Sequence, residues 1–154
     1  MQMEKSQYTE ICNRFTDFLN RENLRKTEER YAILEQICSY DRLFDRQQLY
    51  EDMVKGRLHV SRATVYNTLE VLEQARLVVR HQILSQSVQY ELKILADTHL
   101  HLICQRCGMV REIPLKPLLP AFASFRTARF TPENYCLYIY GLCHKCKRKR
   151  SAGK

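Results

Sequence analysis

Two pairs of cysteines, each with the spacing Cys-x-x-Cys, constrain the fold of this chain more than any other feature. The first pair is Cys104 and Cys107, and the second, after 35 intervening residues, is Cys143 and Cys146. Each turn can present two sulfurs to one metal ion, and Zn²⁺ takes four thiolates in a tetrahedral arrangement. Gly108, directly after the first pair, can adopt backbone conformations that a side chain resists. The spacing therefore predicts a structural zinc site that joins two distant segments and leaves no coordination position open for catalysis.

The alternatives for these cysteines are two unlinked thiol turns or redox-active disulfides. Residues 1–14 hold no apolar run of the signal-peptide type, and nothing in the chain approaches the roughly 18 consecutive apolar residues of a membrane span. We therefore expect a cytoplasmic protein, in which thiols stay reduced. A redox Cys-x-x-Cys would need no matching second pair, so zinc is the favoured interpretation. Three further cysteines lie in apolar segments and are predicted to be buried structural thiols: Cys12, Cys38 and Cys136.

The formal net charge is +8, and it is distributed unevenly. Residues 1–84 contain 13 basic and 13 acidic residues, whereas residues 85–154 contain 12 and 4. Six basic residues lie within the last ten positions: Lys145, Lys147, Arg148, Lys149, Arg150 and Lys154. Residues 147–154 are interpreted as a basic tail, for which the alternatives are a solvated terminus and an auxiliary contact to phosphate.

Residues 1–92 are predicted to form a helical domain that ends in a β-hairpin. From Ile11 onward, apolar residues recur at i, i+4, i+7 and i+8, which indicates an amphipathic helix. Three residues with N-cap chemistry are expected to begin the following helices: Thr27, Asp45 and Ser61. The period then changes to that of strands over residues 77–83 and 87–92, joined by a short turn. Helices followed by such a hairpin are in the order of a winged helix-turn-helix domain.

Residues 93–98 are predicted to be a hinge that leads to a small α/β domain over residues 99–146. Strands are expected at residues 100–104, 109–113 and 135–140. A helix is expected at residues 118–125. The fold class is therefore α+β, with an N-terminal winged helix-turn-helix domain and a smaller zinc-containing domain after it.

The helix predicted to begin at Ser61 has the composition of a DNA-reading element. Small, hydroxyl and amide side chains occupy its first turn and a half, the part of a recognition helix that approaches base edges. Asn67 is suited to pair with adenine in the major groove. Arg80 in the wing and Arg25 before the second helix are candidates for phosphate or minor-groove contacts. The candidate DNA-binding residues are therefore Arg25, Ser61, Arg62, Ala63, Thr64, Tyr66, Asn67 and Arg80. Many ordinary surface helices begin in the same way, so the pattern alone leaves both interpretations open.

Two histidines alternate along a predicted strand, which places both imidazoles on one face. His99 and His101 have the geometry of metal ligands, and Glu91 and Glu112 are candidates to join them. The alternative is that the two histidines are ordinary polar surface residues.

Taken together, these segments resemble the ferric-uptake-regulator family over residues 20–146. The stretches that carry the resemblance lie at residues 30–34, 48–50, 63–66, 101–108 and 138–143. The resemblance implies a winged-helix DNA-binding domain and an α/β dimerisation domain. It further implies a homodimer that binds AT-rich palindromic operators in double-stranded DNA, usually as a metal-dependent repressor of metal, haem or redox homeostasis genes. We expect a regulator of transcription without enzymatic activity.

The resemblance also implies roles for individual residues. Tyr66 and Asn67 fall on the recognition helix, and Arg25 falls where a basic residue enters the minor groove. The four paired cysteines fall on the structural zinc site of the family. A regulatory metal site between the domains is implied at Glu91, His99, His101 and Glu112. The resemblance leaves its effector open among Fe²⁺, Mn²⁺, Zn²⁺, peroxide and haem, although the chain has no Cys-Pro haem motif.

The chain departs from the family pattern at several positions. Arg76 stands where family members usually have a glycine after the recognition helix. Leu43 stands where a histidine of the DNA-binding domain would complete the inter-domain site, so divalent metal is expected to be a weak switch. A second metal site of the family is lost, with other residues at its positions: Thr98, Leu100 and Tyr135. The rival hypotheses are a zinc-stapled protein- or RNA-interaction module and a thiol–disulfide enzyme.

Overall fold

The computed structural model describes residues 3–56, 60–83, 88–118, 120, 129 and 135–151. The chain divides into two compact units. The first unit holds residues 1–82 and 87–93, and the second holds residues 83–86 and 94–154. Within the described part of the chain, no helix is both long enough and apolar enough to cross a membrane.

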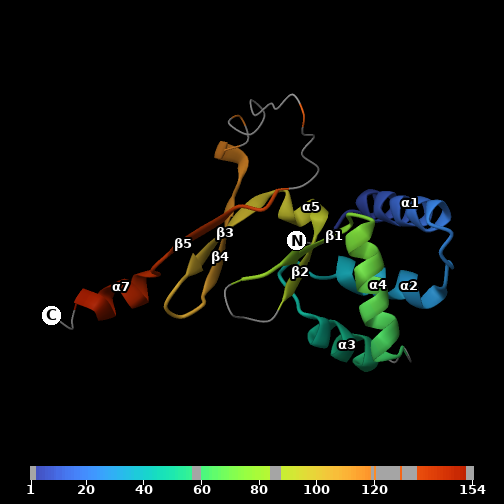
Figure 1. Ribbon diagram of the computed structural model, residues 1–154, viewed down its shortest axis with the longest axis horizontal. Coiled ribbons are helices and arrows are strands. Elements are labelled where there is room, and N and C mark those ends of the chain that lie inside the picture. Colours follow the sequence, from blue (N-terminus) through green and yellow to red (C-terminus); the bar gives the residue numbers. More distant parts are fainter. Residues whose placement is uncertain are drawn as a thin grey trace. The chain divides into compact units, whose positions relative to one another are not determined.

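The described part of the first unit contains four helices followed by a pair of strands (Figure 1). They are α1 (Lys5–Arg21), α2 (Glu28–Cys38), α3 (Arg46–Lys55), α4 (Arg62–Gln74), β1 (Val78–His81) and β2 (Gln89–Leu92). The two strands are antiparallel, with Val78 opposite Leu92 and His81 opposite Gln89. This order confirms the predicted winged helix-turn-helix arrangement. The turn expected between the strands lies outside the described residues.

The apolar faces of the helices form the core of this unit. Helix α1 buries the four residues that its spacing predicted, Ile11, Phe15, Phe18 and Leu19. Helix α2 contributes Ile33, Leu34 and Ile37, and α4 contributes Val65, Leu69 and Leu72, all six with 0% exposure. Each fully buried side chain of this kind contributes about 1.5–3 kcal/mol relative to an exposed one. The core therefore fixes α4 and leaves its opposite face on the surface.

Polar side chains begin α3 and α4 as the sequence predicted. The carboxylate of Asp45 accepts a hydrogen bond from the backbone N–H of Gln48 at 2.8 Å. The hydroxyl of Ser61 accepts one from the backbone N–H of Thr64 at 3.0 Å. Thr27 occupies the N-cap position of α2 but makes no capping hydrogen bond through its side chain. The two bonded caps satisfy N–H groups that the first turn of a helix leaves unpaired.

Arg76 closes α4 in a left-handed backbone conformation, with φ of 58°. Its N–H donates to the carbonyl of Glu73 at 2.9 Å, and the N–H of Leu77 donates to the carbonyl of Leu72 at 3.0 Å. This hydrogen-bond pattern is the Schellman motif, in which the left-handed position favours glycine. Arg76 therefore takes the left-handed position that a C-capping glycine usually occupies.

Arg76→Gly is expected to stabilise the first unit by about 0.5–1 kcal/mol. The left-handed conformation costs a residue with a side chain roughly 1–2 kcal/mol, and the larger unfolded-state entropy of glycine offsets part of that gain. The measurement is the midpoint of urea unfolding at an unchanged slope. Ala75→Gly is the matched control, because Ala75 has φ of −70° and glycine there should destabilise. A lower midpoint for Arg76→Gly would contradict this expectation.

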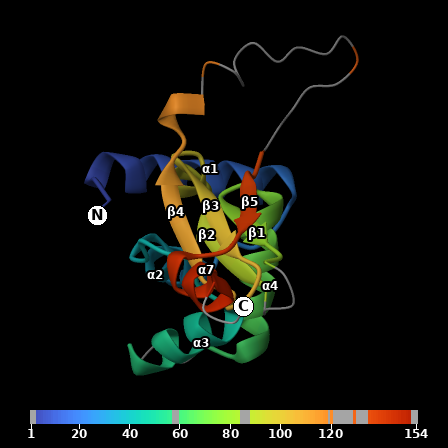
Figure 2. The same ribbon diagram turned by 90° about the vertical axis from the view of Figure 1, so that its left-hand side faces the viewer.

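The second unit is built on a three-stranded sheet (Figure 2). Its described elements, with the short helix that leads into it, are α5 (Lys93–Ala96), β3 (His99–Cys104), β4 (Val110–Pro114), η1 (Lys116–Leu118), β5 (Tyr138–Gly141) and α7 (His144–Ser151). The strand order is β4-β3-β5, with β3 antiparallel to β4 and parallel to β5. The predicted strands are therefore present, and part of the segment predicted as a hinge forms α5. The helix expected at residues 118–125 falls largely outside the described residues.

The prediction that the three remaining cysteines are buried is wrong. Cys12 and Cys38 are half-buried and Cys136 is exposed. Cys12 flanks the apolar stripe of α1, Cys38 is the last residue of α2, and Cys136 precedes β5. An apolar neighbourhood in sequence does not bury a residue at the edge or end of an element. Burial nevertheless raises the pKa of Cys38 to about 12, which keeps this side chain a neutral thiol.

Candidate functional site

The four paired cysteines come together in the second unit. Their sulfur atoms all lie within 4.8 Å of one another, and the sulfurs of Cys107 and Cys143 are 3.8 Å apart. A tetrahedral zinc ion with bonds of about 2.3 Å to sulfur requires sulfur–sulfur separations of about 3.8 Å. The parallel pairing of β3 with β5 brings the pairs together, because it sets Cys104 opposite Gly141. The donor set and its spacing therefore fit a structural zinc ion.

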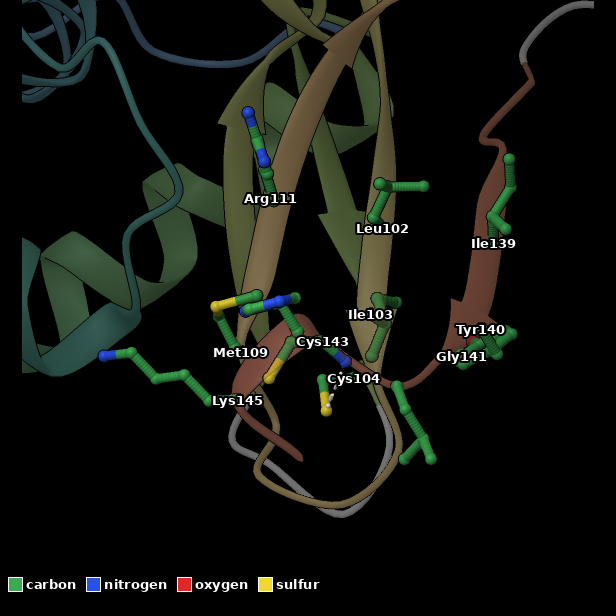
Figure 3. Close-up of a pocket in the computed structure, with 12 residues that line it drawn as sticks. Leu102, Ile103, Cys104, Met109, Arg111, Ile139, Tyr140, Gly141, Cys143 and Lys145 are labelled. Atoms are coloured by element: carbon green, nitrogen blue, oxygen red, sulfur yellow. Dashed lines mark hydrogen bonds between the residues drawn. The ribbon is translucent and has the colours of Figure 1, made fainter. Parts of the chain in front are cut away.

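Backbone N–H groups surround the sulfur of Cys104. Figure 3 shows the hydrogen bond in which the N–H of Cys143 donates to this sulfur, at 3.3 Å. The N–H groups of Cys143, Cys107 and Arg106 together lower the pKa of Cys104 to about 6. Gly108 makes the tight turn possible with φ of 70°, as the sequence predicted. The turn is thus arranged to stabilise a thiolate before any metal binds.

Helix α7 completes the cluster through Cys146. The side chain of this residue is buried, and burial together with the neighbouring thiols raises its pKa to about 12. A zinc ion deprotonates a coordinating thiol outright, so metal binding supplies the charge that Cys146 needs to act as a ligand. Arg106 donates a hydrogen bond to the carbonyl of Cys146 at 3.2 Å. The first Cys-x-x-Cys turn is therefore connected to α7 in two ways: by the side chain of Arg106 and by the cluster of four cysteines.

A second cluster lies across β3 and β4, also within the second unit. The Nε2 atoms of His99 and His101 are 3.4 Å apart, a separation that a metal ion bound to both nitrogens at about 2.0–2.1 Å accommodates. Glu112 is opposite His101 in the register of β3 and β4, and its carboxylate lies 4.0 Å from Nε2 of His99. The ring of Tyr138 stacks on His101 with centroids 5.9 Å apart. The structure thus brings three of the four predicted ligands together.

Glu91, the fourth predicted ligand, belongs to the first unit. Its side chain is 1% exposed, and one carboxylate oxygen lies 3.4 Å from Nε2 of His81, which is also 1% exposed. A carboxylate is costly to bury unless a partner compensates it. The proximity of His81 to Glu91 was not predicted from the sequence, because it follows only from the register in which β1 and β2 pair. The participation of Glu91 in a metal site stays a prediction.

The candidate DNA-binding residues all lie on the first unit. Ser61, Arg62, Ala63, Asn67, Arg25 and Arg80 are exposed, and Thr64 and Tyr66 are half-buried. The guanidinium of Arg62 lies over the ring of Tyr50, 4.8 Å from its centroid. The first two turns of α4 therefore present their polar side chains to the surface, as a recognition helix must.

Arg46, which no sequence pattern singled out, links α3, α4 and β2. Its Nε donates a hydrogen bond to the hydroxyl of Tyr90 at 2.7 Å, and its Nη2 lies 3.6 Å from the carboxylate of Glu70. The same guanidinium lies 5.5 Å from the ring centroid of Tyr66. Arg46, Tyr66 and Arg80 also line one shallow pocket. Arg46 is therefore placed to fix the orientation of Tyr66 on α4.

The comparisons with known proteins agree with this geometry. The ferric uptake regulation protein of Campylobacter jejuni is 27% identical over 158 aligned positions, which cover 100% of this chain and 99% of that protein. The solved Helicobacter pylori ferric uptake regulator has a TM-score of 0.69 at 15% identity, covering 96% of this chain and 97% of that chain, and so shares the fold. The Pseudomonas aeruginosa regulator, solved with manganese, has a TM-score of 0.68 at 25% identity, covering 84% and 97% of the two chains.

A family model matches this chain as well. The model of the Ferric uptake regulator family matches residues 21–140, a span that includes α2, α3, α4, the strands β1 to β4 and most of β5. Members of this family are metal-responsive, dimeric, DNA-binding regulators of transcription. This chain therefore belongs to the Ferric uptake regulator family.

Proposed function

We propose that this protein is a sequence-specific, DNA-binding repressor of transcription that acts as a homodimer. The observation that carries the proposal is the exposed N-terminal face of α4, fixed on a buried core and followed directly by the strands β1 and β2. Ser61 and the first residues after it are exposed, so a phosphate group can approach the positive end of this helix. Asn67, about one and a half turns further along, offers the paired donor and acceptor that recognise adenine.

The basic residues of the same unit supply the less specific contacts. Arg80 is exposed on β1, and Arg25 is exposed just before α2. Guanidinium groups bind phosphates and enter narrow, AT-rich minor grooves, where the negative potential is strongest. The family resemblance supports that role for Arg25. We therefore assign base recognition to α4, and phosphate and minor-groove contacts to Arg25 and Arg80.

The second unit supports the proposed homodimer. Among the described residues, β5 lies at an edge of the sheet and exposes Ile139 and Tyr140 by 47% and 45%. With Leu142 and Met109 these residues line one largely apolar groove (Figure 3). An apolar edge strand is a template for pairing with a second copy. Because a two-fold dimer reads two symmetric half-sites, the operator should be a palindrome.

Binding to an AT-rich palindromic duplex tests this proposal. The zinc-loaded protein is expected to bind such a duplex at least tenfold more tightly than a scrambled duplex of the same length and composition. The measurement is a gel shift at fixed salt, with sedimentation to establish two protomers per duplex. Equal affinity for both duplexes, or preferential binding to single-stranded RNA, would contradict the proposal and favour an interaction module.

We further propose that His99, His101 and Glu112 hold a second divalent ion, Fe²⁺, Mn²⁺ or Zn²⁺, with Glu91 as the fourth ligand implied by the family. The two Nε2 atoms converge within 3.4 Å, which suits one small ion better than the wider haem group. Thr98 Oγ1 lies 3.4 Å from the other ring nitrogen of His99. A partner on the second nitrogen orients a metal-binding imidazole.

Divalent metal is expected to be a weak switch for this protein. A metal shifts a conformational equilibrium only by its difference in affinity between the two states. Leu43 stands where the family has a histidine from the DNA-binding domain, and an alkyl side chain cannot coordinate. Operator affinity is therefore expected to rise by less than about a hundredfold, roughly 2.7 kcal/mol of coupling, when Mn²⁺ is added to protein that retains its structural zinc.

The substitution Leu43→His provides the positive test of this expectation. It should enlarge the effect of Mn²⁺ on operator affinity. The control Leu43→Gln should not, because glutamine resembles histidine in size and polarity but is a poor metal ligand. Affinity is measured for each protein with and without Mn²⁺. If Mn²⁺ raises the operator affinity of the unsubstituted protein more than about a hundredfold, metal binding is already strongly coupled to DNA binding. That result would contradict the proposed role of Leu43.

A further inference from the structure

Helix α7 combines a zinc ligand with a dense run of basic residues. Cys146 is buried, while Lys145, Lys147 and Arg148 on either side of it are exposed. The helix spans His144–Ser151, and the N–H of Lys147 donates to the carbonyl of Cys143 at 2.9 Å. The basic run is therefore an anchored helix at least as far as residue 151.

The charge on this helix exceeds what the zinc site requires. Four thiolates and one Zn²⁺ carry a net charge of −2, whereas the last ten residues carry six positive charges and no negative one. A surplus of four positive charges remains at this end of the chain. By contrast, residues 1–84, which include α4, have no net charge.

This charge distribution indicates that base recognition by α4 and general electrostatic attraction to DNA come from different parts of the chain. Most of the non-specific affinity of a DNA-binding protein comes from cations that displace condensed counterions from phosphates. The half of the chain that carries α4 has no net surplus of cations, although Arg25 and Arg80 are assigned individual phosphate contacts. The largest local surplus in the sequence is that of residues 145–154.

We propose that α7 is a second DNA-contacting element, which binds backbone phosphates of double-stranded DNA. This inference rests on the proposed function. A duplex fits the composition of α7 better than other partners do. The helix has no Phe, Tyr or Trp on which an unpaired base of single-stranded RNA could stack, and its apolar residue, Cys146, belongs to the four-cysteine cluster and is not offered to a protein partner.

The test is a variant that removes charge from α7 and retains the four cysteines. Lys147, Arg148, Lys149 and Arg150 are each replaced by glutamine, which keeps a good helix former at every position. The matched control removes the same charge at exposed basic residues elsewhere: Lys5, Arg14, Lys116 and Arg129. Affinities for operator and for scrambled duplex are measured over a range of salt concentrations, after zinc content and dimerisation have been checked.

The α7 variant is expected to bind both duplexes about 10- to 100-fold more weakly, with their ratio unchanged. The slope of log affinity against log salt should become shallower by about 0.9 for each phosphate that the protein no longer neutralises, by about two to four in total. The control should keep the slope of the unsubstituted protein. An unchanged slope in the α7 variant, an equal weakening in the control, or a weakening confined to single-stranded RNA would overturn the inference. Failure of the unsubstituted protein to distinguish operator from scrambled duplex would instead refute the proposed function.

Discussion

Cys143→Ser is expected to abolish tight zinc binding and to dissociate the dimer. The four sulfurs form a closed site in which cysteines that follow β5 meet a cysteine at the end of β3. The described apolar core of the second unit is small, so its fold depends on this connection. Structural zinc sites of this kind have apparent binding energies of about 10–16 kcal/mol, which are also folding energies. The measurements are metal content after dialysis and sedimentation of the variant.

The matched control for this experiment is Cys136→Ser. Cys136 is exposed and is not one of the four clustered cysteines, so this variant should retain one zinc ion per chain and remain a dimer. A Cys143→Ser protein that keeps stoichiometric zinc and its dimeric state would show that the four cysteines are not the zinc site.

Tyr66→Ala and Asn67→Ala are expected to remove sequence preference without removing DNA binding. Each good base contact contributes about 1–3 kcal/mol of discrimination, or roughly ten- to a hundredfold in the ratio of operator to scrambled affinity. Alanine favours helix, and Asn67 is exposed, so α4 should persist in the Asn67→Ala protein. The measurement is that affinity ratio at constant salt, because phosphate contacts change both affinities together.

Gln74→Ala serves as the control for these substitutions. Gln74 is exposed at the opposite end of α4, away from the turns assigned to base contacts. Its replacement should leave the ratio unchanged. If Tyr66→Ala and Asn67→Ala also leave the ratio unchanged, α4 is not the recognition helix.

The zinc cluster and the helix caps could be predicted because their chemistry is local. Two Cys-x-x-Cys turns need only one sheet to bring them together, and β3 with β5 provides it. Asp45 and Ser61 make the capping bonds that their positions indicated. Each Cys-x-x-Cys turn and each capping bond depends on residues three positions apart, so the sequence shows these parts directly.

The partners of Arg46 and His81 could not be predicted because they depend on tertiary packing. Arg46 and Tyr90 are 44 residues apart in the chain, and His81 meets Glu91 only after β1 and β2 have paired in one register. The failed burial prediction for Cys136 has the same origin. An apolar stretch of sequence indicates a strand, but its edge residues are buried only if another element covers them.

Selection of DNA from a pool of randomised duplexes tests the central claim most directly. The zinc-loaded dimer is incubated with the pool, and bound duplexes are recovered and sequenced over several rounds. We predict enrichment of an AT-rich inverted repeat, and we predict that the Asn67→Ala protein loses the preference at symmetric positions of both halves. Recovery of duplexes with no shared motif, or of a motif without two-fold symmetry, would contradict the proposed function.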